Sequence, residues 1–290
     1  MSNYCIITES TADLTPELIA RFDVNVIPMR FSFGDKEFYN YPDNRELSPQ
    51  VFYQMLKNGE VSTTTAINIG QFEEAFLPIL ERGQDILYLG FSSAMSSTYS
   101  TSLLVAQQLK EQFPQREVVT IDTLAASMGE GLLVCLAGEM RKNGAGLYEV
   151  ADWVQNNLQN VCHWITVDDL MYLYRGGRVS AISAHVGTAL GIKPILHVDD
   201  KGRLIPAAKV RGRKQSIEAL ADKIMQLGTD VSQQMIFIGH TEALDAASML
   251  ADIINTRYAP KEIQIASVGP VVGSHTGPGL VALFFMGQHR

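Results

Sequence analysis

The feature that most constrains this chain is a regular alternation of apolar, strand-like runs with helical segments along its first half. Strand candidates lie at 4–8, 85–91 and 117–121. The first of these is followed by Thr15 and Pro16, a capping residue and a proline suited to the first turn of a helix. Strands separated by helices pair in parallel, with the helices covering the faces of the sheet. The pattern therefore predicts a parallel α/β domain.

The pattern changes after about residue 160, where strand candidates follow one another closely and only two long helices, 214–227 and 242–257, accompany them. The strand candidates are 162–167, 195–198, 203–207, 235–240, 263–268 and 280–285. We therefore predict two domains, an N-terminal parallel-sheet α/β domain over 1–160 and a C-terminal α+β domain over 161–290. No low-complexity linker separates them, so we expect close contact between the two.

Composition and charge exclude several classes of protein. Among the 290 residues, 46% are hydrophobic and 19% are charged, which is typical of a folded globular chain. The net charge of −8 argues against nucleic acid as the main partner. No apolar run approaches the roughly 18 residues of a membrane span, and no signal peptide is evident. We expect a cytoplasmic protein without a membrane span; transient contact with a membrane surface stays open.

The cysteine and histidine positions argue against a metal site. The three cysteines, Cys5, Cys135 and Cys162, are widely spaced and form no Cys-x-x-Cys motif, so we expect reduced thiols. The histidines likewise show no spacing typical of metal ligands.

The segment 267–279 carries four glycines and two prolines between two strand candidates. A glycine-dense loop between buried strands indicates that something approaches the backbone closely. Ser274, His275 and Thr276 lie inside this segment, so we predict a functional role for it. The alternative is a tight turn whose polar residues satisfy their own backbone.

Hydroxyl side chains gather where the predicted parallel strands end, at 8–11, 92–98 and 122–123. Such ends lie at one edge of a parallel sheet, where ligands bind, and serine-rich turns before a helix can hold an anion. For Ser96 and Ser97 we favour helix capping. Gly90-Phe-Ser-Ser-Ala94 also resembles a nucleophile elbow, and Ser92, Asp122 and His275 follow the order of a hydrolase triad. A serine hydrolase is therefore an alternative.

Two arginine-containing segments are also candidates. The turn 175–178 ends in Arg178, whose guanidinium could pair with a carboxylate or phosphate. The cluster 209–214 contains Arg211 and is basic in an otherwise acidic chain.

In chain order these motifs resemble the DegV family, which includes the bacterial FakB-type fatty-acid-binding proteins that serve fatty acid kinase. The segments that carry the resemblance are Ile-Thr-Glu-Ser-Thr-Ala-Asp-Leu at 7–14, Ser-Ser-Ala-Met-Ser-Ser-Thr-Tyr at 92–99, Asp122, Leu-Tyr-Arg-Gly-Gly-Arg-Val-Ser at 173–180, Lys-Pro-Ile-Leu at 193–196, Val-Arg-Gly at 210–212, Gly-Pro at 269–270 and His-Thr-Gly-Pro-Gly at 275–279. The chain departs from the family pattern at 64–68 and 96–98.

The resemblance implies two domains with one long-chain fatty acid bound at their interface. By position in the family motifs, it implies carboxylate contacts from Thr64, Ser93, Arg178 and His275. Supporting positions in the same loops are Ser92, Thr65 and Thr276. It also implies that Arg211 contacts the kinase.

The function that the resemblance implies is to bind the acid and present its carboxylate to the kinase, which forms an acyl phosphate from ATP. The protein would have no turnover alone and no cofactor besides its ligand. A serine hydrolase and a lipid-holding sensor without a kinase partner stay open.

Overall fold

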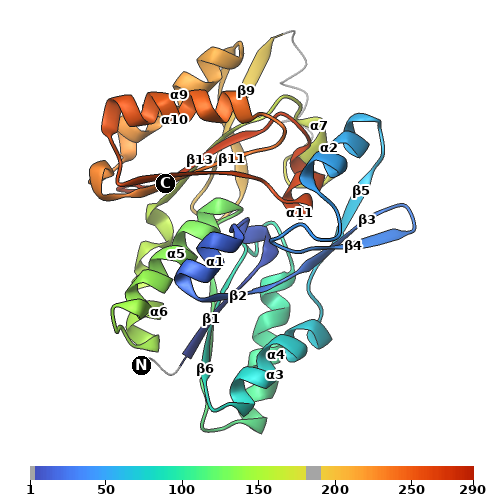
Figure 1. Ribbon diagram of the computed structural model, residues 1–290, viewed down its shortest axis with the longest axis vertical. Coiled ribbons are helices and arrows are strands. Elements are labelled where there is room, and N and C mark those ends of the chain that lie inside the picture. The colour runs from blue at the N-terminus through green and yellow to red at the C-terminus, as the bar shows by residue number, and fades with distance from the viewer. Residues whose placement is uncertain (1–3, 181–190) are drawn as a thin grey trace.

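A computed structural model describes residues 4–180 and 191–290 (Figure 1). The first half forms a parallel sheet in the order β2-β1-β6-β7, as predicted from the alternation of strands and helices. Its strands are β1 (Tyr4–Glu9), β2 (Val24–Ile27), β6 (Asp85–Gly90) and β7 (Val118–Asp122). Helices α3 (Ile69–Glu81) and α4 (Thr98–Gln112) pack on one face, and α1 (Pro16–Phe22), α5 (Met128–Lys142) and α6 (Leu147–Asn157) pack on the other.

The starts of these helices follow from local sequence chemistry. The Thr15 side chain accepts a hydrogen bond from the Leu18 N–H, with Pro16 in the first turn of α1. Asn68 and Gln71 form a reciprocal capping box at α3. The helix start at Thr15 and Pro16 was predicted from the sequence, and that prediction is confirmed.

The second half forms a separate six-stranded mixed sheet in the order β10-β9-β8-β13-β11-β12. Its strands are β8 (Val161–Thr166), β9 (Ile192–Val198), β10 (Leu204–Arg211), β11 (Met235–His240), β12 (Glu262–Ser267) and β13 (Val281–Met286). Helices α9 (Arg213–Leu227) and α10 (Leu244–Tyr258) cover its outer face. The predicted α/β fold with a parallel sheet and a mixed sheet is therefore confirmed.

Helix α5 packs against both the parallel sheet and the mixed sheet. Figure 1 shows it between the parallel sheet and the mixed sheet, and one hydrophobic core continues across it. Leu132 and Leu133 of α5 share this core with Leu87 of β6 and Phe284 of β13, and all four are almost fully buried. The contact between the two halves is thus an apolar core and not a flexible linker.

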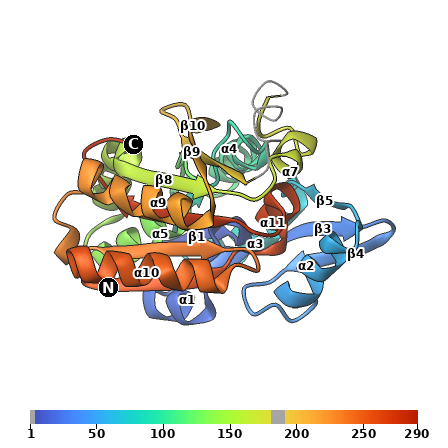
Figure 2. The same cartoon turned by 90° about the horizontal axis from the view of Figure 1, so that it is seen from above.

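A small antiparallel sheet, in the order β4-β3-β5, projects beside these layers together with α2 (Figure 2). Its elements are β3 (Met29–Phe33), β4 (Lys36–Asn40), β5 (Ser62–Thr65) and α2 (Pro49–Lys57). The strand candidates of the sequence did not include β5, which is short and rich in threonine. This sheet brings β5 beside the glycine-rich segment 267–279.

That segment is not only a loop, because a short helix, α11 (Pro270–Thr276), forms at its centre. Pro270 occupies the first turn, where its fixed φ favours a helix and its missing N–H costs nothing. Gly277 ends the helix with a φ of +68°. His275 thereby lies in the last turn of a helix that packs against β5 and against α7 (Met171–Arg175).

Short 3₁₀ segments complete the elements of the described residues, at Ser10–Ala12, Leu158–Asn160 and Val231–Gln233. Within 4–180 and 191–290, no helix is long and apolar enough to cross a membrane.

Candidate ligand-binding site

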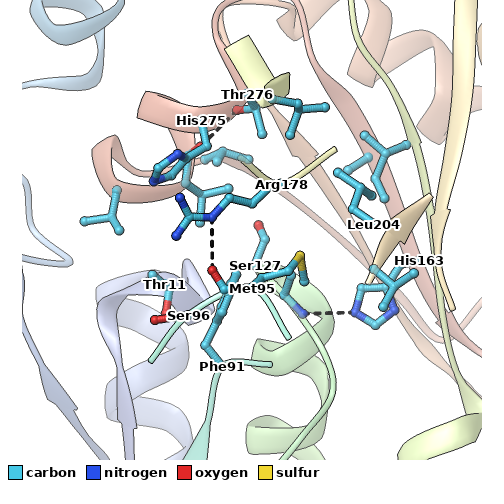
Figure 3. A pocket seen from close by; sticks show the side chains of 18 of the residues that line it. Thr11, Phe91, Met95, Ser96, Ser127, His163, Arg178, Leu204, His275 and Thr276 are labelled. Atoms are coloured by element: carbon cyan, nitrogen blue, oxygen red, sulfur yellow. Dashed lines mark hydrogen bonds between the residues drawn. The ribbon is translucent and has the colours of Figure 1, made fainter. Parts of the chain in front are cut away.

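A pocket lies between the two halves of the molecule and is lined by residues from both (Figure 3). The space between its lining atoms, including the part open to solvent, is about 850 Å³. Its walls are mainly apolar: Phe91 and Met95 come from the loop after β6, Ile165 from β8, and Ala282 and Phe284 from β13. An elongated apolar ligand suits such a lining.

Polar groups concentrate at one end of the pocket. The hydroxyl of Thr64 on β5 lies 2.9 Å from Nε2 of His275 on α11. A second pair from the same two elements, the hydroxyls of Ser62 and Ser274, lies 2.7 Å apart and holds β5 against α11. The Thr64–His275 pair therefore rests on a fixed contact between two elements.

Arg178 brings a positive charge to this polar end. Its Nε–H donates to the carbonyl of Met95 at 3.0 Å, and its Nη1 donates to the carbonyl of Gly176. Both acceptors are neutral, and the structure gives Arg178 no carboxylate partner among the described residues. Burial lowers the pKa of this half-buried guanidinium, which nevertheless stays charged at neutral pH. An incoming carboxylate would supply the missing countercharge.

His275 is neutral in this environment. Burial, and secondarily the nearby charge of Arg178, lower its pKa to about 4. A neutral imidazole has one donor and one acceptor nitrogen, so it can relay a hydrogen bond between Thr64 and a ligand oxygen. The net charge of the polar end is then that of Arg178 alone, which matches one carboxylate.

Gly176 allows this arrangement. A Cβ atom built on Gly176 would overlap Nδ1 of His275, so any larger residue there would displace the imidazole. The two glycines of the 175–178 turn are therefore needed for different reasons. Gly176 leaves room for the His275 ring, and Gly177 adopts a φ of +72°, which favours glycine.

Two hydroxyl residues in the lining are held by buried acids. Thr11 donates to Glu9 at 3.2 Å, and Ser127 donates to Asp13 at 2.5 Å. Burial raises the pKa of both carboxyls to about 7, against the effect of their hydrogen bonds. Both hydroxyls already donate to these acids, so neither is a free O–H donor for a ligand.

The structure brings three of the four predicted carboxylate contacts together. Thr64, Arg178 and His275 line the pocket, whereas Ser93 is exposed, lies outside the lining, and donates its backbone N–H to Asp122 at 3.1 Å. The role assigned to Ser93 stays a prediction. Ser96, which we interpreted as a helix cap, does line the pocket and also bonds Thr98 at 3.1 Å.

Of the three predicted supporting positions, only Thr276 lines the pocket, and Thr65 and Ser92 do not. Thr276 lines the pocket and donates to the carbonyl of Val272 at 3.2 Å. Thr65 is exposed on the other face of β5. Ser92 is buried and donates to the carbonyl of Gly202 at 2.7 Å, so its hydroxyl links the two halves. Arg211 is exposed at the end of β10, away from the lining.

The hydrolase triad is not assembled. Ser92 is bonded to Gly202, His275 to Thr64, and Asp122 accepts from the backbone N–H groups of Ser93 and Leu124. A nucleophile needs a base within hydrogen-bonding reach, and these three side chains have other partners.

The far end of the pocket was not predicted from the sequence. His163 of β8 and Leu204 of β10 line it on the side opposite His275 and Arg178 (Figure 3). Nothing in the sequence marks either residue, since one is a lone histidine in an apolar strand and the other a leucine after a turn. In 4–180 and 191–290, no group of three or more His, Cys, Asp or Glu side chains is placed to hold a metal ion.

The parallel sheet, the separate mixed sheet and the pocket between them define the class, an α/β protein with a pocket between its two main sheets. The family model described as "Uncharacterised protein, DegV family" matches residues 3–288. The chain therefore belongs to the DegV family.

Individual relatives agree with this assignment. A DegV domain-containing protein of Clostridium perfringens is 39% identical over 290 residues, covering 100% of this chain and 99% of its own. The crystal structure of a DegV lipid binding protein from Thermotoga maritima matches with a TM-score of 0.87 and 28% identity, covering 100% of both chains. A DegV family protein from Thermus thermophilus, described by its fatty acid binding, matches with a TM-score of 0.87 and 27% identity over 98% of this chain and 99% of that one.

Proposed function

We propose that this protein binds one long-chain fatty acid, with the carboxylate at Thr64, Arg178 and His275 and the acyl chain along the apolar walls. The observation that carries the proposal is a cation, Arg178, with no carboxylate partner among the described residues, beside a neutral imidazole–hydroxyl pair at one end of a mainly apolar pocket. The fatty acid binding described for the Thermus thermophilus relative supports it.

The expected affinity follows from the acyl chain. Burying about 16 carbons at ~0.8 kcal/mol each contributes ~13 kcal/mol before the costs of association. The head-group contacts add selectivity for a carboxylate. We further propose that residues 1–160 and 161–290 are the two domains that enclose the ligand.

In this proposal the protein is of the FakB type and presents the carboxylate to a fatty acid kinase, which forms an acyl phosphate from ATP. It has no turnover of its own. Arg211 is the proposed kinase contact. It is exposed and lies two residues before Arg213, which pairs with Asp168 and donates to the carbonyl of Gly279. Arg213 thus connects the exposed basic cluster to the segment that carries His275.

Extraction of the purified protein with organic solvent, followed by mass spectrometry, tests lipid binding. We expect about one equivalent of C14–C18 fatty acid per chain. Well-folded protein that carries no fatty acid and binds none on addition would contradict the proposal. Labelling by a fluorophosphonate would instead favour the hydrolase, and binding without any kinase activation would favour a lipid-holding sensor.

A further inference from the structure

Side chains from four neighbouring strands form a row across the far end of the pocket. Phe284 of β13 pairs in register with His163 of β8, and their rings pack edge to face with centroids 5.4 Å apart. Leu204 of β10 pairs with Val198 of β9. All four residues line the pocket on the inner face of the mixed sheet.

The next row toward the polar end is more open. Ala282 pairs with Ile165 there, and both line the pocket. Side chains two residues apart on a strand lie on the same face, about 7 Å from each other. An acyl chain that passes the small Ala282 side chain therefore meets the larger Phe284 and His163 side chains one row later.

His163 is fixed in this row and offers the ligand no hydrogen bond. Its Nδ1 lies 3.0 Å from the carbonyl of Val161, and its Nε2 accepts the N–H of Ala126 at 3.2 Å. A Cβ atom built on Gly129 of α5 would overlap the imidazole, so the ring fills the space that this glycine leaves. Burial lowers the pKa of His163 to about 3, which keeps the ring neutral. It therefore acts as a rigid wall without a free donor or acceptor.

We propose that His163, flanked by Leu204, ends the acyl pocket and sets the maximum length of the fatty acid that this protein accepts. The proposal rests on the fatty acid binding proposed above, and it adds a residue that determines specificity. It also requires an apolar end on the ligand, because no polar group of His163 is free to receive a hydroxyl or a second carboxylate.

The test is the dissociation constant for a series of saturated acids from C12 to C22, measured for wild type, His163→Ala and Leu204→Ala. We call the acid that binds wild type most tightly the optimum. In each variant, the acid that is two carbons longer should gain about tenfold in affinity relative to that optimum, because two more methylenes are buried. Ile205→Ala is the matched control. Ile205 is the next residue on β10, is half-buried like Leu204, and does not line the pocket.

Thermal unfolding comes first, because His163→Ala leaves the Ala126 N–H without its partner. Should that variant not fold, Leu204→Ala decides, since Leu204 is only half-buried. The inference is overturned if the folded variants keep the chain-length profile of wild type. It is also overturned if Ile205→Ala shifts the profile as much as they do.

A dicarboxylic acid of the optimal length is the second arm. We expect it to bind wild type at least tenfold more weakly than the monocarboxylic acid, and equal binding would overturn the inference. Failure of the proposed function is distinguishable, because wild type would then bind no fatty acid of any length.

Discussion

Replacing Thr64 by valine tests the polar end of the pocket most directly. Valine keeps the β-branched shape and the strand preference of threonine, so β5 should keep its geometry. The change removes one hydroxyl, which lies 2.9 Å from Nε2 of His275. A hydrogen bond to a charged group is worth about 1.5–3 kcal/mol, so a fatty acid should bind roughly 10- to 150-fold more weakly.

The assay compares a fatty acid with its methyl ester by titration calorimetry or by displacement of a fluorescent acid. The ester keeps the acyl chain but not the charge, so its affinity should change much less than that of the acid. Thr65→Val is the matched control, since Thr65 is exposed on the opposite face of the same strand. It should leave both affinities unchanged.

Two results would refute the reasoning. Equal losses for acid and ester would mean that Thr64 shapes the pocket and does not hold the carboxylate. A loss in Thr65→Val as large as that in Thr64→Val would mean that β5 itself is disturbed.

The remaining predictions concern presentation and pH. Arg211→Ala should keep its affinity for fatty acid but lose acyl-phosphate formation in a turnover assay with the cognate kinase. Normal turnover of this variant would exclude a docking role for Arg211. His275→Ala should lower turnover at saturating lipid, with only a modest loss of binding. Burial raises the pKa of the Asp13 carboxyl from 3.8 to about 7, so the folded protein holds a proton that the unfolded chain releases. This carboxyl should therefore lower the free energy of unfolding by up to about 4 kcal/mol as pH rises from about 4 to about 7, on top of the decline expected from Glu9, and Asp13→Asn should make the total decline smaller by that amount. Urea titrations of both proteins at several pH values measure it, and parallel curves would exclude Asp13 as the cause.

Local chemistry was enough to predict most of the fold. The strands and helices of the first half follow from hydrophobic periodicity and from caps such as Thr15, which act within a few residues. The helix α11 was missed because glycine and proline dominate 267–279, although Pro270 is where a first helical turn tolerates proline. β5 was missed because a short run of threonines has no hydrophobic alternation.

The site depended on contacts that no local pattern encodes. The glycine-rich segment 267–279 made His275 a candidate, the turn 175–178 made Arg178 one, and the family resemblance added Thr64. Only the packing of β5 against α11 brings Thr64 to His275, across 211 residues of sequence. Only the pairing of β8 with β13 sets His163 beside Phe284 at the far end of the pocket. The sequence alone therefore determined the elements, since their signals span a few residues. The pocket was decided by tertiary structure, because strand order and helix packing join distant side chains.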